Sequence, residues 1–525
     1  MELKQYPIHR KYKKCEAKNQ ITMGNDYGVP DGKPDIAEIL QKRGEICIEE
    51  VHTEKGKIRI RGMLKVSVFY LAERSSEVVN SFGMEFPFEE MLYMEGAVSG
   101  DNLKIDWNLE ELRVTIVHPG KLSVRAIVTL HGEIISVQTH QITESLKETA
   151  GAELKSESFV MAEPVIERRD SCRIRDEIQL PANKPNVETI LWKNLQVRGL
   201  EITKGEGTVS LKGELLVSLI YKGEGDEIGI QWIEQSIPFH GNVEVSGMTF
   251  EMPGWIAAEI SHQNVDIKPD YDGEMRMFAV ELLLELHLHM FEEKQCSYLA
   301  DSYSTKESWD LQKEELGFEK VRMCTQTKCS IEKREDISEE TKILQIVGHH
   351  GELLGKNVKV VEGGILCEGT LEVQVLYVTI NDRRPFGSSV ISIPYSQLIE
   401  VPQMGKEDRW NVQEGIEQLN ISMADGNHLE IRGRLKFDAC VLQQCSLRNV
   451  VKIESQPYNP EAFQKMPGMR IHFVQQGESL WQIAKENRTT MEEILKCNEL
   501  QEEEISPGQK LLLVKAMEGP VLHLS

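Results

Sequence analysis

The stretch "KPDIAEILQKRGEICIEEVHTEKGKIRIRGMLKVSVFY", Lys33 to Tyr70, returns twice later in the chain. At a constant offset of 151 residues, Lys184–Tyr221 reads "KPNVETILWKNLQVRGLEITKGEGTVSLKGELLVSLIY", with 12 of 38 positions identical and no gap. A third copy follows at an offset of 307 from the first, and there the Lys-Pro opening has become Glu340-Thr341. Ungapped matches of this length indicate an internal repeat, which is typical of tandem architectures.

The last part of each copy alternates between apolar and polar residues, which predicts a β-strand with one buried face. Gly62, Gly213 and Gly369 hold matching positions on the apolar face, where glycine predicts a β-bulge or a close backbone approach. Pro34–Leu40 is compatible with a helical turn, because proline is tolerated early in a helix. The residues predicted to be buried are Ile58, Ile60, Leu64, Val66, Val68 and Tyr70 in the first copy, and Val209, Leu211, Leu215, Val217, Leu219 and Tyr221 in the second.

Further segments keep the same offsets and complete each repeat. Phe86-Pro87-Phe88, Ile237-Pro238-Phe239 and Ile393-Pro394-Tyr395 match one another, and closing strands are predicted at Leu122–Leu130, Met275–Met290 and Leu429–Leu442. We therefore expect a mainly β protein with three tandem antiparallel β-sandwich-like domains, each of about 150 residues. Their expected limits are 1–150, 151–305 and 306–455.

The composition is that of an ordinary globular protein. The 525 residues carry a net charge of -24, which opposes sequence-independent binding to nucleic acid. The basic run Arg10–Lys14 is an exception, and we expect it to lie at a solvated strand end. The first residues show no secretory signal, and no apolar run approaches the roughly 20 residues of a membrane span. Ten irregularly spaced cysteines indicate free thiols in a reducing cytosol.

A different pattern begins after residues 456–468, a proline-rich segment that we interpret as a linker. Ile471–Val474 is predicted to be a short strand, and a turn with a second strand closes the segment. Between them, two capping boxes that begin at Ser479 and Thr490 each predict the start of a helix. Residues 469–516 are therefore expected to form a small α+β module with the order strand, helix, helix, strand.

The first of these helices has a clear inward face. Its i, i+3, i+4, i+7 spacing predicts that this face is made of Leu480, Ile483, Ala484 and Asn487. Trp481 lies about 100° away from that face, so we expect it to be partly exposed and available for contact. Exposed tryptophans are enriched at binding hot spots. The alternative is that Trp481 only covers the edge of the small domain.

Several clusters of chemically active residues fail the tests for known sites. Glu285, His287 and His289 share a strand face that we interpret as solvated, without a metal ion. The acidic residues around Gly273 lack the EF-hand spacing and predict a hairpin turn, and Gly348–Lys356 lacks the P-loop sequence. We therefore expect no catalytic residue, no cofactor and no metal ion.

Each part of the chain resembles a known domain family. The triplicated unit resembles the SPOCS domain of sporulation proteins from spore-forming Firmicutes, and "VQQGESLWQIA", followed by Asn498 and "ISPGQKL", resembles a LysM domain. The LysM resemblance implies a groove for N-acetylglucosamine-containing glycan, formed by the loops on either side of the helix pair. The implied binding residues are Gly477, Glu478, Ser479, Leu480, Asn498, Glu499, Leu500, Ile505, Ser506, Pro507 and Gly508, with Trp481 as the exposed contact beside them.

The module also departs from the usual LysM pattern. Glu478-Ser479 replaces the usual Asp-Thr, His472 replaces the aromatic residue of the first strand, and the second loop carries Glu502-Glu503-Glu504. A bulkier acid and an acidic rim weaken the case for glycan as the ligand.

Three SPOCS-like units followed by a LysM-like module resemble the clostridial spore-coat morphogenetic proteins. This resemblance implies a non-enzymatic scaffold in the mother-cell cytoplasm, at the outer forespore surface, that tethers the spore coat. The implied partners are the stage IV A sporulation ATPase, bound by the LysM-like module, other spore-coat proteins and further copies of the chain. The alternative is a protein that binds peptidoglycan of cortex or wall, and a third reading is a wall hydrolase.

Overall fold

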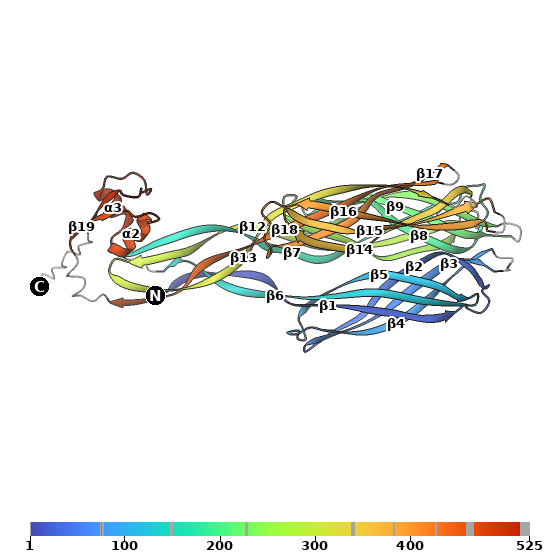
Figure 1. Ribbon diagram of the computed structural model, residues 1–525, viewed down its shortest axis with the longest axis horizontal. Coiled ribbons are helices and arrows are strands. Elements are labelled where there is room, and N and C mark those ends of the chain that lie inside the picture. Colours follow the sequence, from blue (N-terminus) through green and yellow to red (C-terminus); the bar gives the residue numbers. More distant parts are fainter. Residues whose placement is uncertain are drawn as a thin grey trace.

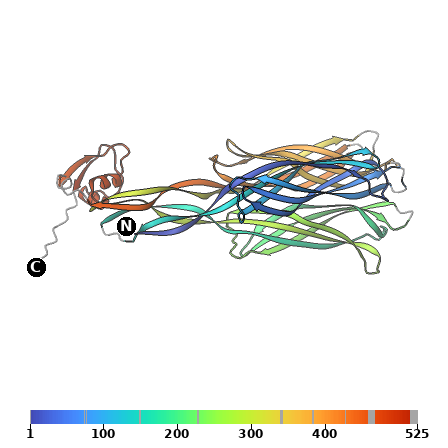
Figure 2. The same ribbon diagram turned by 90° about the horizontal axis from the view of Figure 1, so that it is seen from below.

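The computed structural model describes residues 2–73, 75, 78–147, 151–225, 229–337, 342–381, 384–425, 428–457 and 467–514. It shows a broad head of β-sheets, a narrower stalk and a small α+β module at the tip of the stalk (Figure 1 and Figure 2). The predicted mainly β architecture of three antiparallel units and a small βααβ module is confirmed.

Each repeat supplies six strands that form two antiparallel sheets of three strands. The sheets of the first repeat have the strand orders β2-β3-β4 and β1-β6-β5, and the other two repeats follow the same scheme. The strands of the first repeat are β1 (Leu3–Gly28), β2 (Ile36–Glu54), β3 (Lys57–Ala72), β4 (Val79–Tyr93), β5 (Asn102–His118) and β6 (Lys121–Leu146). Those of the second are β7 (Ala152–Gln179), β8 (Val187–Lys204), β9 (Thr208–Gly223), β10 (Ile230–Glu244), β11 (Gly254–Pro269) and β12 (Met275–Ser304). Those of the third are β13 (Glu307–Asp336), β14 (Ile343–Val361), β15 (Gly364–Thr379), β16 (Phe386–Glu400), β17 (Arg409–Asp425) and β18 (His428–Pro457).

The two sheets of each repeat bury their apolar faces against each other. Every residue predicted to be buried on the central strands β3 and β9 is at most 1% exposed. Pro34–Leu40 forms no helical turn, because β2 begins at Ile36 and pairs with β3. Ile36 packs into the core of the first sandwich, while Leu40 packs into the cluster where the three repeats meet. Because both side chains are buried in this way, the segment adopts an extended backbone instead of a helical turn.

The repeated glycines make room for an aromatic ring. Gly62 lies opposite Phe88 in the β3–β4 pairing, and a Cβ atom on Gly62 would lie 2.6 Å from that ring. The same pairing joins Gly213 to Phe239 and Gly369 to Tyr395. On the other side of each glycine, the edge strand is bulged. The predicted bulge and the predicted close approach therefore both occur, on opposite sides of the central strand.

The Lys-Pro opening anchors the end of the central strand. Tyr70 donates its hydroxyl hydrogen to the carbonyl of Pro34 at 2.9 Å, and Tyr221 donates to the carbonyl of Pro185 at 3.4 Å. In the third repeat, where the equivalent residues 340–341 lie outside the described residues, Tyr377 donates to a carbonyl of β16. The repeated tyrosine is thus hydrogen-bonded to a backbone carbonyl in all three repeats.

The longest strands leave the head in pairs. β6 pairs with β5 only as far as Ile135, and beyond that residue it pairs with β1 alone. In the same way, β12 continues past Met290 with β7, and β18 continues past Leu442 with β13. The three ribbons run together from the head toward the small module (Figure 1). They form the stalk, which the sequence patterns did not predict.

The stalk has its own buried core. Asn449 donates its side-chain N–H to the carbonyl of Gln141 at 2.8 Å and accepts the backbone N–H of Thr143 at 3.1 Å. The Thr143 hydroxyl donates to the carbonyl of Val450 at 2.5 Å, so the β6 and β18 ribbons are joined by buried hydrogen bonds. Apolar residues from all three ribbons surround this region, and they include Ile8, Ile142, Met161, Tyr298, Leu316, Phe318 and Leu447.

The basic run Arg10–Lys14 is not a solvated strand end. It lies inside β1, where Lys11 forms an ion pair with Glu167 of β7 and Lys14 forms one with Asp101. Strand β1 continues through the run because β6 pairs with it along its whole length. Lys11 and Lys14 therefore join β1 to a neighbouring strand and a neighbouring loop through ion pairs.

The C-terminal module consists of β19 (Met469–Phe473), α2 (Leu480–Asn487), α3 (Met491–Cys497) and β20 (Lys510–Val514). Both predicted capping boxes are present, with Ser479 and Thr490 as the N-caps. Of the predicted linker, residues 456–457 are the end of β18, and 458–466 lie outside the described residues.

Candidate functional site

The two loops expected to bind a ligand meet at one end of the small module. The backbone N–H of Val474 donates to the carbonyl of Gln509 at 2.9 Å, and that of Gly508 donates to the carbonyl of Val474 at 2.7 Å. Gly477 and Gly508 have φ values of 89° and 84°, in the left-handed region that favours glycine. The two glycines thus allow the tight turns that bring the loops together.

The expected binding residues divide into exposed and structural ones. Gly477, Ser479, Glu499 and the run 506–508 are exposed, while Glu478, Leu500 and Ile505 are half-buried. Glu478 accepts hydrogen bonds from the backbone N–H of Gln475 and from the ring of His472, and both bonds lower its pKa. The Glu478 carboxylate therefore holds its own loop in place.

Leu480 and Asn498 are structural residues of the module. Leu480 is 3% exposed and packs in the module's core. The side chain of Asn498 donates to the carbonyls of Ile494 and Leu512 and accepts the backbone N–H of Leu512 at 2.6 Å. These bonds join the end of α3 to β20, so Asn498 fixes the second loop.

Trp481 joins the module to the stalk. Its indole N–H donates to Oδ2 of Asp301 on β12 at 2.8 Å, and its ring meets the Tyr303 ring edge-on with centroids 5.0 Å apart. The Tyr303 hydroxyl donates to the carbonyl of Thr489, and Tyr303 is buried within the core of the module. Trp481 is half-buried as expected, but its polar atom already has a partner in the same chain.

A lysine of the same helix strengthens this contact. Lys485 donates to both carboxylate oxygens of Asp301 at 2.8 Å, and Lys313 of β13 reaches Oδ1 at 3.2 Å. Burial disfavours the charged form of Asp301, but the bonds from Lys485 and Trp481 lower its pKa overall. Charge-assisted bonds of this kind are about twice as strong as neutral ones. The module is thus docked on the stalk through one half-buried carboxylate.

The outer face of the module's sheet is largely apolar and exposed, and Lys510 places its ammonium over the Phe473 ring at one end of it. Met469, Ile471 and Phe473 alternate along β19 and are 68%, 60% and 57% exposed. In the β19–β20 pairing, Leu512 lies beside Ile471 and Val514 beside Met469. This apolar face was missed by the sequence interpretation, although the period-two alternation of "MRIHF" signals it.

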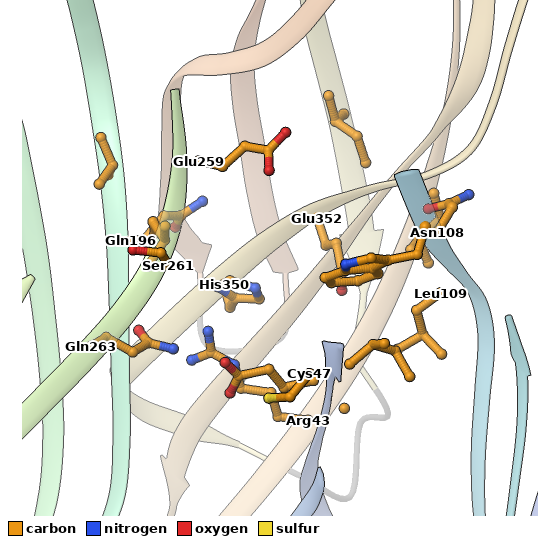
Figure 3. A pocket seen from close by; sticks show the side chains of 18 of the residues that line it. Arg43, Cys47, Asn108, Leu109, Gln196, Glu259, Ser261, Gln263, His350 and Glu352 are labelled. Carbon is orange, nitrogen blue, oxygen red and sulfur yellow. The ribbon is translucent and has the colours of Figure 1, made fainter. Parts of the chain in front are cut away.

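A second candidate site lies in the head. A cavity of about 1260 Å³ is lined mainly by β2, β5, β8, β11, β14 and β17, each of which is an edge strand of its sheet (Figure 3). His350 and Glu352 of β14 are near the middle of that view, with Gln263 of β11 to the left and Arg43 of β2 below them. The cavity thus draws polar side chains from all three repeats.

The electrostatics of this cavity follow from burial. Burial, and then the neighbouring side chains of Arg43, His349 and Arg198, lower the pKa of His350 to about 3, so its ring is neutral at physiological pH. Burial and the nearby Glu372 raise the pKa of Glu352. Buried atoms such as Nδ1 of His350 and Oε1 of Gln263 have no hydrogen-bond partner among the described residues.

The described residues that line the cavity include no reactive pair. Burial raises the pKa of Cys47, so its thiol stays protonated, and the Ser261 hydroxyl donates to the backbone of β12. Among the described lining residues, no serine or cysteine is hydrogen-bonded to a histidine. The described lining residues therefore provide polar contacts for a ligand but no activated nucleophile.

The other motifs have structural roles. His289 stacks on Trp255 with ring centroids 5.0 Å apart, so the face with His287 is partly covered and not freely solvated. The acidic stretch around Gly273 is the predicted hairpin turn, in which Asp270 accepts the backbone N–H groups of residues 272 and 274. Within the described ranges, no group of three or more His, Cys, Asp or Glu residues is arranged to hold a metal ion. No helix there has the length and apolarity to cross a bilayer.

Comparison with family models identifies both kinds of domain. The model of the SipL SPOCS domain matches residues 35–117, 186–268 and 342–424, and the LysM domain model matches residues 472–514. The SPOCS matches cover β2–β5, β8–β11 and β14–β17, so the long strands that build the stalk lie outside them. Comparison with curated proteins and with solved structures gave no match.

Proposed function

Because this sporulation-associated chain combines three SipL SPOCS domains with a LysM domain of peptidoglycan-binding type, we propose that it is a non-enzymatic scaffold of the spore coat. In this proposal it resides in the mother-cell cytoplasm at the outer forespore surface. Its LysM domain binds the stage IV A coat morphogenetic ATPase and thereby tethers the coat to the forespore. The SPOCS head provides further surface for other coat proteins or for self-association.

The observation that carries this proposal is the apolar face of the LysM sheet. Met469, Ile471 and Phe473 expose most of their side-chain surface on one side of β19. Contiguous exposed apolar residues are typical of protein-binding surfaces. Sugars, by contrast, are bound mainly by polar groups and aromatic rings in a groove. The location of these side chains on a sheet face, rather than within the two loops, therefore favours a protein partner.

The docking of Trp481 supports the same proposal. Its indole N–H is bonded to Asp301, and its ring packs on Tyr303. A glycan that used this tryptophan as its main contact would compete with the stalk. A protein partner on the outer face of the sheet meets no such competition.

The second candidate function is binding to the N-acetylglucosamine glycan of cortex or wall. It is favoured by the LysM match and by the exposed loop residues Gly477, Ser479 and Ser506. Under this alternative, the ligand lies between the two loops rather than on the apolar face.

Binding measurements on the full chain separate the two candidates. We expect Ile471→Asp to weaken binding to the purified ATPase at least tenfold, because it places a charge within the apolar interface. Tyr271→Asp, at a fully exposed hairpin of the head, is the matched control and should bind normally. Pro507→Trp, a bulky change at an exposed position of the second loop, should leave ATPase binding unchanged. Retention on purified peptidoglycan without any ATPase binding would contradict the proposed function.

A further inference from the structure

Two cysteines of the third repeat face each other across a strand pair. Cys324 of β13 and Cys440 of β18 are directly opposed in the antiparallel register. Opposed residues have Cα atoms about 4.5–5.5 Å apart and project to the same face of the sheet. A disulfide requires a Cα separation of about 4.4–6.8 Å. All ten cysteines are described and free, and this is the one pair opposed in the strand register.

The surroundings of Cys324 favour its thiolate. The Cys440 thiol donates a hydrogen bond to the Cys324 sulfur, and this bond, with further help from the backbone N–H of Gly254 and the charge of Lys204, lowers the pKa of Cys324 to about 7. The same bond raises the pKa of Cys440, which remains the protonated donor. Cys324 is exposed, whereas Cys440 is buried. An exposed thiolate beside a protonated thiol is the arrangement of an attacking and a resolving cysteine.

The pair lies where two repeats meet. Gly254 begins β11 and Lys204 ends β8, so both groups that stabilise the Cys324 thiolate belong to the second repeat. A bulge in β13 between Val321 and Met323 lies immediately before Cys324. The thiolate therefore contributes to the contact between the second and third repeats, near the base of the stalk.

We propose that Cys324 and Cys440 form a reversible disulfide when the protein meets a peroxide. The Cys324 thiolate attacks one peroxide oxygen, the O–O bond breaks, and hydroxide leaves, so that Cys324 becomes a sulfenic acid. The Cys440 sulfur then attacks the Cys324 sulfur, its proton passes to the departing hydroxyl group, and water is released. In sum, two thiols and one hydrogen peroxide give one disulfide and two waters, and a thiol reductant restores the pair.

The disulfide changes the contact between repeats as well as the strand pair. It replaces the Cys324 thiolate by a neutral sulfur, so the Gly254 N–H and the Lys204 ammonium lose the charge that they face. The link also ties β13 to β18 at the point where their ribbon leaves the sheet. Oxidation therefore makes the third repeat more rigid. It also weakens the electrostatic contact between the third repeat and the second.

The test treats the reduced full-length protein with a small excess of hydrogen peroxide and then blocks the remaining thiols. We expect the wild type to lose two of its ten thiols and to yield a peptide pair linked through Cys324 and Cys440. Dithiothreitol should reverse both changes. Cys329→Ser, on the same strand, is the matched control and should form the same link.

Two variants separate the steps. Cys440→Ser should stop at the sulfenic acid, which dimedone traps on Cys324, and Cys324→Ser should lose no thiol at the same dose. The proposal is overturned if wild-type Cys324 is oxidised beyond the sulfenic acid while Cys440 remains free. It is equally overturned if the pair survives peroxide unchanged, or if the linked peptides contain other cysteines.

Discussion

The indole N–H of Trp481 donates a hydrogen bond of 2.8 Å to Asp301, a residue 180 positions earlier in the chain. The bond joins the LysM domain to the far end of the second repeat. Lys485 and Lys313 share the same carboxylate, which makes Asp301 the centre of the docking contact. The most informative changes are therefore those that weaken this contact without altering either partner's core.

Asp301→Asn should loosen the LysM domain from the stalk. The amide keeps the shape of the carboxylate but loses the charge that Lys485 and Trp481 stabilise, and hydrogen bonds to charged groups contribute about 1.5–3 kcal/mol. We expect faster amide hydrogen exchange in α2, by about tenfold or more. Asp310→Asn, an exposed residue of the same stalk, is the control and should leave this exchange unchanged. Equal exchange in both variants would show that the carboxylate does not hold the domain.

The exposure of Trp481 could be predicted from its local sequence, but its contacts could not. The helical spacing placed it off the inward face, and the structure indeed leaves it half-buried. No local pattern could reveal Asp301 or Tyr303 as its partners, because contacts between domains depend on the three-dimensional arrangement of segments far apart in the chain.

The apolar face of β19 is the opposite case. Its alternation is visible in the sequence, but alternation alone does not tell which side is covered.

Gly62→Ala should destabilise the first sandwich. The added Cβ would lie 2.6 Å from both the Phe88 ring and the carbonyl oxygen of Cys47, and the backbone cannot move away cheaply. Overpacking of a core typically costs about 1–3 kcal/mol. Gly83→Ala in the neighbouring strand is the control, because its Cβ would meet nothing closer than 4.0 Å. Chemical denaturation curves of the two variants measure the difference, and equal stability would contradict the predicted clash.

Asn449→Ala should open the stalk. The change removes the partner of the buried Thr143 N–H and of the Gln141 carbonyl, and each buried polar group left unpaired costs about 1–3 kcal/mol. We expect a lower melting temperature and faster hydrogen exchange at residues 141–143. Asn25→Ala, an exposed position on β1, should change neither. Unchanged exchange in the Asn449 variant would show that the ribbons do not depend on this bond.

Acid should weaken the junction of the three repeats. The pKa of His350 is about 3 in the folded protein, against an ordinary value near 6.5, so the unfolded chain binds the proton more readily. The stabilising contribution of the neutral ring is thus present above pH 6.5 and is lost as the pH falls toward 3. His289, whose pKa is lowered to about 4 by burial and then by Lys104, acts in the same direction.

The pH effect is measured as the difference between the wild type and His350→Gln. The glutamine keeps a polar side chain but does not titrate, so its stability should depend less steeply on pH between 6.5 and about 4. Burial raises the pKa values of Glu319 and Glu352, so these groups change the stability with pH in the opposite direction. Both proteins contain them, and their contribution therefore cancels when the two stability curves are subtracted. Parallel curves for the two proteins would rule out His350 as the source of the acid sensitivity.

The sequence predicted the sandwiches well and the stalk not at all. In the sandwiches, Ile58, Val66 and their neighbours alternate because one sheet face meets a single opposing sheet. In the stalk, residues such as Ile142 and Tyr298 are buried by ribbons from the other repeats. Such burial depends on the arrangement of all three repeats. The apolar residues of a single stalk strand therefore do not follow a simple alternating pattern.

The stalk also sets a distance. A strand rises by about 3.3 Å per residue, so the part of β18 from Gln443 to Pro457 spans roughly 45 Å. The stalk would therefore hold a partner of the LysM domain at a set distance from a partner bound to the head. The hydrogen-bonded strands of the stalk determine that distance. Deleting two residues from each of the six stalk strands should shorten that gap by about 7 Å and keep every side chain on its own face. In this way the protein would act as a molecular ruler whose length is adjustable in steps of two residues.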